Sequence, residues 1–314
     1  MMCYSFGMIT HYFRTLKDAE LKTLEAARNG VWTHVMDPTD DEITQLVGEY
    51  GLDEAILEDA RDFFEVPRME RSQGATYFFT RYPFNQNQED VDTAPLLIVM
   101  GETFVLTVAV KDVPQFKRFI DGTVDIVTTQ KAKFFIQIMS TLTTDFERKL
   151  VRLRRAVHKH RAEIGGIGRR EIERFVNYEH ELNDMAAALV PTNAWLNQVT
   201  AGNFMQLYNE DIELMEDLMI ANSQLVDSAR TVMKTIQNVR SATEAILTQR
   251  LNTTITTLTI ITVLLTIPTI VASLFGMNVP VPLATHPYGF WLISGVIVAL
   301  VAIIVGILRW QRWI

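Results

Sequence analysis

The feature that most constrains this chain is a long stretch without formal charge near its C-terminus. Arg250 is followed by no Asp, Glu, Lys or Arg until Arg309, which leaves 58 consecutive uncharged residues. Two apolar runs lie within the stretch, at residues 258–275 and 290–308. Each has about the 20-residue length that a helix needs to cross a bilayer. The sequence therefore predicts two transmembrane helices in a lipid bilayer.

The charges that flank the two runs predict their orientation. The 14 residues between the runs, 276–289, are too few for anything but an antiparallel hairpin, so both outer ends lie on one side. Lys and Arg occur at those outer ends and are absent from the loop. By the positive-inside rule, both termini are cytoplasmic and the loop is external. We therefore expect a protein of the cell (inner) membrane that crosses it twice.

The composition of the remaining chain excludes several functions. The whole chain has a net charge of −8, and all of its Asp and Glu residues lie before residue 250, which argues against a nucleic-acid partner and suits a region that meets cations. Because Cys3 is the single cysteine of the chain, an internal disulfide and a Cys-based zinc site are excluded. No signal peptide is recognisable in residues 1–17. Because no catalytic constellation is found, an enzyme is not expected.

The first 130 residues alternate strand and helix patterns, which indicates a small α/β domain. Residues 31–36 predict a strand, and Thr39 with Glu42 forms a capping box for a helix that should end near Gly51. A short helix is expected at about 53–62 and a strand at 75–83. Further strands are expected at 96–100 and 103–109, on either side of a two-residue turn signal.

Helical periodicity begins at residue 131. Apolar residues recur every three or four positions up to Val157, and a second helix should follow from about Arg169 until Pro191 breaks it. No glycine lies between residues 202 and 276 and no proline between 191 and 268, which predicts one helix over about 205–275. Such a helix would be roughly 105 Å long and would join the soluble part to the first span.

The predicted fold class is an α+β membrane protein. The predicted domains are a cytoplasmic α/β domain (1–130), an antiparallel helical hairpin (131–204), a cytoplasmic stalk helix (205–250), a first transmembrane helix (251–275), an external loop (276–289), a second transmembrane helix (290–308) and a basic cytoplasmic tail (309–314).

The first span carries polar side chains that repeat at helical spacing, whereas the second carries a single hydroxyl. The polar positions of the first span are Asn252, Thr256, Thr259, Thr262, Thr266, Thr269 and Ser273. Steps of three and four residues place such a series on one face of a helix. That face must meet protein or water, so it either packs against other helices or lines a water-filled path. A path would require several hairpins around one axis.

The triplet Gly276-Met277-Asn278, directly after the first span, resembles the signature of the CorA family of magnesium and divalent metal ion transporters. The resemblance covers essentially the whole chain. It is supported by Leu57-Glu58-Asp59 ahead of Pro67, by Asn252 at 26 residues before Asn278, and by Pro268 within the first span. The triplet is short, but at the mouth of a C-terminal hairpin it is specific.

The resemblance implies a homopentamer whose first spans line one pore. Positions that match the pore face of the family are Asn252, Ile255, Leu258, Thr262, Thr266, Thr269 and Ser273. The triplet Gly276, Met277 and Asn278 would form the selectivity filter, where amide oxygens accept hydrogen bonds from the waters of a hydrated ion. At the cytoplasmic end this face passes through Ile255 and Leu258 instead of Thr256 and Thr259. The implied transported ion is Mg²⁺.

The resemblance also implies regulation by intracellular divalent cation. Glu58, Asp59 and Asp217 match acidic residues of the family that bind such ions between neighbouring subunits, so that Mg²⁺ would be both transported and regulatory. The chain departs from the family pattern at Phe275, where many members have Tyr, and in its external loop, which has no carboxylate but contains His286. These departures leave open a Zn²⁺, Co²⁺ or Ni²⁺ transporter, with or without proton coupling. An alternative of another class is a membrane-anchored cytosolic sensor.

Overall fold

The computed structural model describes residues 9–84, 92–161, 169–201, 204–205, 207–279, 282 and 286–311. The chain divides into two compact units, Met1–Val239 and Arg240–Ile314, and each is described by itself. The helices are α1 (Asp40–Tyr50), α2 (Glu54–Asp59), η1 (Pro114–Phe116), α3 (Lys117–Ile120), α4 (Lys131–Arg161), α5 (Arg169–Ala201), α6 (Asn209–Phe275) and α7 (Gly289–Trp310).

In the first unit, the described residues form one mixed sheet of seven strands. Its order is β2-β1-β3-β7-β6-β5-β4, and β3 pairs with β7 in parallel while the other neighbours are antiparallel. The strands are β1 (Ile9–Phe13), β2 (Lys22–Leu24), β3 (Val31–Met36), β4 (Met69–Ser72), β5 (Ala75–Phe84), β6 (Asp92–Met100) and β7 (Phe104–Ala109).

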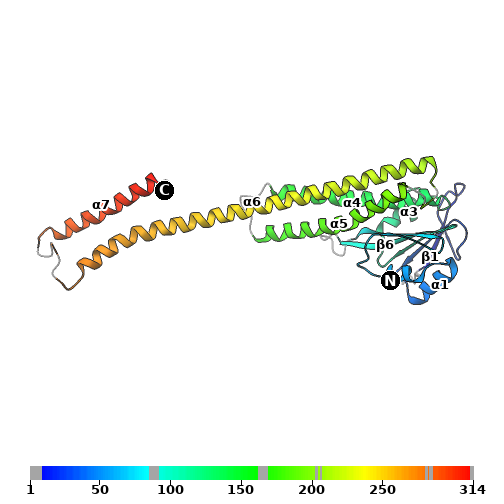
Figure 1. The fold of residues 1–314 in the computed structure, drawn as a ribbon, viewed down its shortest axis with the longest axis horizontal. Coiled ribbons are helices and arrows are strands. Elements are labelled where there is room, and N and C mark those ends of the chain that lie inside the picture. Colours follow the sequence, from blue (N-terminus) through cyan, green and yellow to red (C-terminus); the bar gives the residue numbers. More distant parts are fainter. Residues whose placement is uncertain are drawn as a thin grey trace. The chain divides into compact units, whose positions relative to one another are not determined.

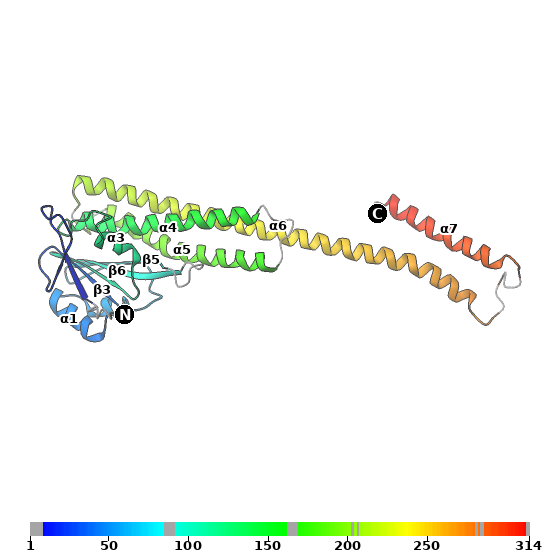
Figure 2. The same cartoon turned by 180° about the vertical axis from the view of Figure 1, so that it is seen from behind.

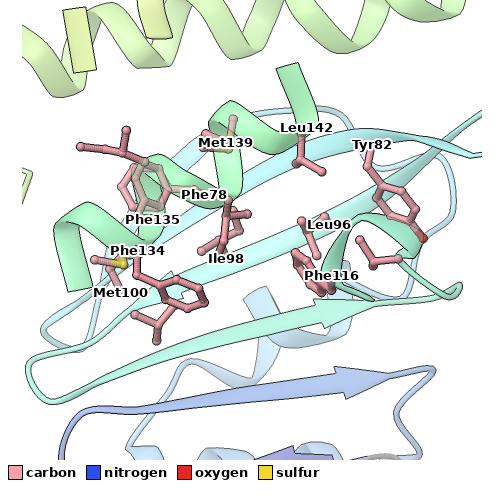
Figure 3. Close-up of a cluster of buried hydrophobic side chains, with 14 of the residues drawn as sticks. Phe78, Tyr82, Leu96, Ile98, Met100, Phe116, Phe134, Phe135, Met139 and Leu142 are labelled. Carbon is pink, nitrogen blue, oxygen red and sulfur yellow. The ribbon is translucent and has the colours of Figure 1, made fainter. Parts of the chain in front are cut away.

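Helices cover both faces of the sheet (Figure 1, Figure 2). Alternate strand residues point to opposite faces. Leu97 and Val99 of β6 pack with the buried residues of α1 and α2, while Leu96, Ile98 and Met100 pack with α3, α4 and η1. Figure 3 shows this second core, in which aromatic rings from α4 lie against the sheet. The Phe78 and Phe135 rings, for example, have centroids 4.6 Å apart. The sheet therefore separates α2 from α4–α6.

Beyond the sheet, α4, α5 and the first part of α6 pack into a three-helix layer. The predicted apolar stripe of α4 is buried, from Phe135 to Val157. On α6 most buried positions advance by alternating steps of four and three residues, which is the seam of coiled-coil packing. These positions are Asp211, Met215, Leu218, Asn222, Leu225, Ala229, Val232, Ile236 and Val239. Tertiary packing therefore stabilises the N-terminal part of this long helix.

Pro191 does not break α5, which was predicted to end there. The helix continues to Ala201 with Pro191 inside it. A proline inside a helix costs about 3 kcal/mol because a hydrogen bond is lost. The buried stripe of α5 continues across it through Leu189, Trp195 and Leu196. Burial of several large side chains, each contributing about 2 kcal/mol, outweighs the missing bond.

Several predicted boundaries also need correction. α6 begins at Asn209, not near residue 205, and α2 ends at Asp59, not near 62. β7 begins at Phe104, so the connection from β6 spans three residues instead of two. Val176 of α5 is 52% exposed, whereas Phe175 beside it is buried. The connection between α4 and α5 lies outside the described residues. The division of the soluble part at residues 130, 204 and 250 remains a proposal.

The second unit contains the end of α6 and α7, which run antiparallel (Figure 1). These are the two helices, among the described residues, that are long and apolar enough to cross a membrane. Neither of their apolar windows is buried by the chain itself. Exposed apolar surface of this extent needs lipid or further copies of the chain to cover it. The fold class predicted from the sequence, an α+β membrane protein, is confirmed.

Candidate ion pathway along α6

Every residue that was predicted to line a pore lies on the exposed surface of α6. The positions are Asn252, Ile255, Leu258, Thr262, Thr266, Thr269 and Ser273. At about 100° per residue, the four hydroxyl residues from Thr262 to Ser273 fall within a strip about 60° wide. In the helix that follows the charged stalk, they form a continuous polar ridge. Nothing within the described residues of this chain covers that ridge.

The less exposed residues of this segment lie on the opposite side of the helix. They are Thr256, Ile260, Leu264, Ile267, Pro268, Val271 and Phe275. Their mean direction is about 180° from that of the polar ridge. Thr256 is therefore turned away from the ridge, whereas Ile255 and Leu258 are 52% and 64% exposed. Ile255 and Leu258 thus lie on the same side of the helix as the ridge, toward its N-terminal end, and Thr256 does not.

The threonine hydroxyls of the ridge donate hydrogen bonds to the helix itself. Oγ1 of Thr262 donates to the carbonyl oxygen of Leu258 at 2.8 Å, and Oγ1 of Thr266 donates to that of Thr262 at 2.7 Å. Oγ1 of Thr269 donates to the Leu265 carbonyl at 2.8 Å. Because each hydroxyl has one proton, its remaining lone pairs act as acceptors toward the exterior. The ridge therefore presents neutral acceptor groups to whatever lies alongside it.

The Gly276-Met277-Asn278 triplet lies where α6 ends. The Gly276 amide donates to the Ala272 carbonyl at 2.9 Å, and the Met277 amide approaches that of Leu274 at 3.5 Å. A Cβ at Gly276 would lie 3.2 Å from the Ala272 oxygen, which is a close contact. Asn278 follows on the exposed surface. The helix end therefore holds a neutral amide just beyond the last turn of the polar ridge.

His286, in the loop before α7, does not offer a free nitrogen lone pair in this conformation. Its Nδ1 accepts a hydrogen bond from the Tyr288 backbone amide at 3.3 Å. In the neutral ring the other nitrogen then carries the proton. A metal ion would need a rearranged loop or a different tautomer. The structure therefore gives no support to His286 as a preformed ligand for Zn²⁺, Co²⁺ or Ni²⁺.

The three predicted regulatory acids do not come together within one chain. Glu58 and Asp59 lie at the end of α2, on one side of the sheet, while Asp217 lies on α6, on the other. All three side chains are exposed or partly exposed. Glu58 pairs with Arg61 at 3.0 Å, and Asp59 with Arg68 at 2.6 Å. Among the described residues, no cluster of three or more His, Cys, Asp or Glu is placed to hold a metal ion.

The sequence profile of one family matches residues 28–309, and its description is CorA-like Mg²⁺ transporter protein. The chain belongs to the CorA family. The match includes strands β3 to β7 of the sheet, the three-helix layer and nearly all of both apolar helices. The polar ridge and the triplet at its end thus belong to a member of a transporter family, and two apolar helices place this CorA family member in a membrane.

Individual relatives agree with the family. The cobalt/magnesium transport protein CorA of Methanocaldococcus jannaschii is 24% identical over 291 residues, which cover 90% of this chain and 91% of the relative. The complete structure of the CorA magnesium transporter from that organism has a TM-score of 0.86 at 21% identity and covers 98% of this chain and 99% of its own. The whole fold, including the membrane hairpin, is therefore that of CorA.

More distant solved structures share the same fold. The full-length CmaX protein has a TM-score of 0.73 at 15% identity, with 96% of this chain and 97% of its own covered. The cytoplasmic domain of ZntB from Vibrio parahaemolyticus has a TM-score of 0.65 at 8% identity and covers 78% of this chain and 100% of its own. These likenesses show the fold and do not assign an ion.

Sequence patterns did not reveal the ion pairs around Asp59. Arg68 contacts Asp59, Glu65 and Glu70 through its three guanidinium nitrogens. In the sequence these residues are only separate charges at the end of α2, in the following loop and in β4. The acids at 65 and 70, on either side of Arg68, were the sequence signal that could have indicated this group of ion pairs. The position of Arg68 itself depends on how β4 pairs with β5.

Proposed function

We propose that this protein is a homopentameric channel that moves hydrated Mg²⁺ across the cell membrane. The observation that carries the proposal is the polar ridge of α6, which is uncovered in the single chain and ends at Asn278. Five copies would turn their ridges toward a common axis and leave a water-filled path between them. Apolar residues of α6 on the other side, together with α7, would face protein and lipid.

The chemistry of the ridge suits a hydrated divalent cation. Mg²⁺ releases its waters reluctantly, so a site that required the bare ion would face a large desolvation penalty. The ridge offers hydroxyl and amide oxygens, which accept hydrogen bonds from the waters bound to the ion. Between Arg250 and Arg309 no carboxylate is available to hold the ion tightly. Weak binding at several successive sites lets the ion leave as well as enter.

The membrane potential supplies a sufficient driving force in this proposal. A divalent cation gains about 4.6 kcal/mol per 100 mV on moving toward an inside-negative compartment, twice the value for a single charge. No phosphate-cradling, Gly-rich Lys motif is found in the sequence. Both termini would lie in the cytoplasm, with the loop after α6 outside, as the Lys and Arg distribution requires.

Co²⁺ is the second ion that we propose, because the M. jannaschii relative is named as a cobalt/magnesium transport protein. Transport of Zn²⁺ or Ni²⁺, with or without proton coupling, is the competing proposal. The hydrogen bond that occupies Nδ1 of His286 counts against a loop built to capture those softer ions. The preference among ions is therefore a matter for direct flux measurement.

We further propose that intracellular Mg²⁺ closes the channel by binding between Asp59 of one copy and Asp217 of a neighbouring copy, with Glu58 nearby. Within one chain these residues lie on opposite sides of the sheet, so an ion could bridge them only between copies. Facing carboxylates repel each other unless a cation lies between them. Loss of internal Mg²⁺ would then loosen the contact between neighbouring copies and favour opening.

The decisive experiment combines assembly and flux. The purified protein should have the mass of five chains in detergent, and proteoliposomes that contain it should take up Mg²⁺ when the interior is made negative. Parallel measurements with Co²⁺, Zn²⁺ and Ni²⁺, each with and without a pH gradient, would rank the ions. A protein that is monomeric in lipid, or that moves no divalent cation under any of these conditions, would contradict the proposal and favour a membrane-anchored sensor.

A further inference from the structure

Arg68 is anchored at the edge of the sheet directly before β4. Its backbone amide donates to the Phe79 carbonyl at 3.2 Å, and the Phe79 amide donates to the Arg68 carbonyl at 2.8 Å. The guanidinium carbon lies 4.1 Å from the centroid of the Phe79 ring, which is 1% exposed. This cation–π contact and the backbone pairing fix where the positive charge lies.

Three carboxylates from three segments converge on this guanidinium. Nη2 contacts Oδ2 of Asp59 at 2.6 Å. Nη1 contacts Glu65 in the loop after α2, and Nε contacts Glu70 in β4. The planar fork of arginine can meet several carboxylates at once, which a lysine ammonium does less well. One positive charge therefore faces three negative ones, and two negative charges remain in excess.

The guanidinium keeps its charge in this setting. Burial alone would lower the pKa of Arg68, but the hydrogen bond to Glu70 and the charges of Glu65, Glu70 and Asp59 outweigh it and raise the pKa. Deprotonation therefore does not release Asp59 under cellular conditions. Only movement of the side chain, or competition from another cation, does so.

We propose that Arg68 is a built-in counter-cation that competes with intracellular Mg²⁺ for Asp59 and so sets the Mg²⁺ concentration at which the channel closes. The proposal rests on the proposed function, in which Asp59 helps to bind the regulatory ion. Because the guanidinium is tethered beside Oδ2, its effective concentration there is high. An arriving Mg²⁺ ion must either displace the guanidinium or bind beside it against electrostatic repulsion. The two excess negative charges of the three carboxylates still attract a divalent cation.

The competition predicts that removing the charge of Arg68 makes closure more sensitive to Mg²⁺. In Arg68→Gln, the concentration of internal Mg²⁺ that halves the flux should fall about two- to five-fold, the range expected for loss of a partly exposed ion pair. Arg68→Lys keeps the charge but not the fork, and its half-inhibiting concentration should lie between those of Arg68→Gln and the wild type. Arg71→Gln is the matched control, because Arg71 is an exposed residue of the adjoining strand β4 with no ion pair among the described residues.

A second measurement does not depend on flux. The full-length protein in detergent should gain thermal stability as Mg²⁺ is added, and the midpoint of that titration should fall by the same factor in Arg68→Gln. Adding Asp59→Asn to Arg68→Gln should abolish the gain in sensitivity. If Arg68→Gln unfolds, the titration of Arg68→Lys and its flux decide the matter instead.

The outcomes separate the two proposals. A wild type whose stability and flux ignore internal Mg²⁺ would overturn the regulatory part of the proposed function and this inference with it. A wild type that responds to Mg²⁺, with Arg68→Gln and Arg68→Lys both unchanged or less sensitive, would overturn this inference alone. An equal shift in Arg71→Gln would also overturn it, since a general loss of positive charge would then explain the result.

Discussion

Thr262 and Thr266 lie one turn apart on the uncovered face of α6, and the hydroxyl of Thr266 donates to the backbone carbonyl of Thr262 at 2.7 Å. Bonds of this kind satisfy a polar side chain inside a membrane helix without a partner helix. They also orient the hydroxyl, so that its lone pairs face outward. The threonines therefore do not need hydrogen bonds to other helices. Their lone pairs remain available to accept hydrogen bonds along the proposed path.

Replacement of Thr266 by Val should reduce Mg²⁺ flux roughly ten-fold while the protein still assembles. Valine is close to threonine in size but lacks the hydroxyl, so the change removes an acceptor from the proposed path, together with the bond to the Thr262 carbonyl. The matched control is Thr257→Val, because Thr257 makes the same kind of bond, to the Thr253 carbonyl at 2.9 Å, but lies on the other side of the helix. Flux assays on both variants test the ridge, and equal losses would contradict it.

Asn278→Ala should reduce flux to the background of empty liposomes. The amide of Asn278 is the proposed acceptor for the waters of the incoming ion, and alanine has no such group. The exposed neighbour Val279 provides a control, since Val279→Ala changes an apolar side chain next to the same helix end. If Asn278→Ala transports Mg²⁺ like the wild type, the hairpin is an anchor and not a pathway.

Local signals in the sequence predicted local structure well. The capping box of Thr39 and Glu42 is present in full, and Gly51 ends α1 with a left-handed backbone. The amphipathic stripe of α4 and the uninterrupted α6 were also predicted, because helical periodicity depends on neighbours within a few residues. The same reasoning found the polar ridge, whose spacing alone places its hydroxyls on one face.

Features that depend on distant partners were missed. The short strands β1, β2 and β4 have weak patterns of their own and exist because other strands pair with them. Pro191 was predicted to end a helix, but packing of Trp195 and Leu196 carries the helix past it. The convergence of three carboxylates on Arg68 likewise depends on the pairing of β4 with β5. No local rule gives such contacts.

Thr39→Ala should destabilise the soluble unit by about 1 kcal/mol, the usual effect of removing an N-cap side chain. The Thr39 hydroxyl accepts from the Glu42 amide at 3.3 Å, and the Thr39 amide donates to the Glu42 carboxylate at 2.9 Å. Thr44→Ala is the control, because Thr44 is exposed in the same helix but caps nothing. Denaturant unfolding of the detergent-solubilised protein measures both, and a larger effect at Thr44 would contradict the prediction.

Acidification should destabilise the soluble unit through His34. Burial lowers the pKa of His34 from 6.5 to about 4, and the ring lies against Phe116 with centroids 5.0 Å apart. Between pH 6.5 and pH 4 the unfolded chain binds a proton at this histidine that the folded chain does not. The free energy of unfolding therefore falls as the pH drops through this range, and the contribution of His34 is constant above and below it. Because the side chain keeps some contact with solvent, we expect a loss of about 1–2 kcal/mol.

The test is thermal unfolding at several pH values for His34→Gln and for His180→Gln. His34→Gln should make the unfolding temperature less dependent on pH between pH 6.5 and pH 4. The exposed His180 of α5 serves as the control, and its replacement should leave the slope near that of the wild type. Equal slopes in all three proteins would show that other groups carry the acid sensitivity.

Asp217→Ala should raise the internal Mg²⁺ concentration needed to close the channel by roughly five-fold or more, which corresponds to about 1 kcal/mol of lost binding. Asp217 is exposed on α6, and Asp59 lies across the sheet, so the proposed ion joins two copies and needs both carboxylates. Asp227→Ala is a suitable control, since Asp227 is an exposed acid of the same helix that pairs locally with Arg230 at 3.5 Å. The half-inhibiting Mg²⁺ concentration, measured by flux into proteoliposomes, should move in the direction opposite to that expected for Arg68→Gln. If Asp217→Ala transports Mg²⁺ with an unchanged dependence on internal Mg²⁺, this residue is excluded from the regulatory site. The closed state would then be held without the Asp217 carboxylate.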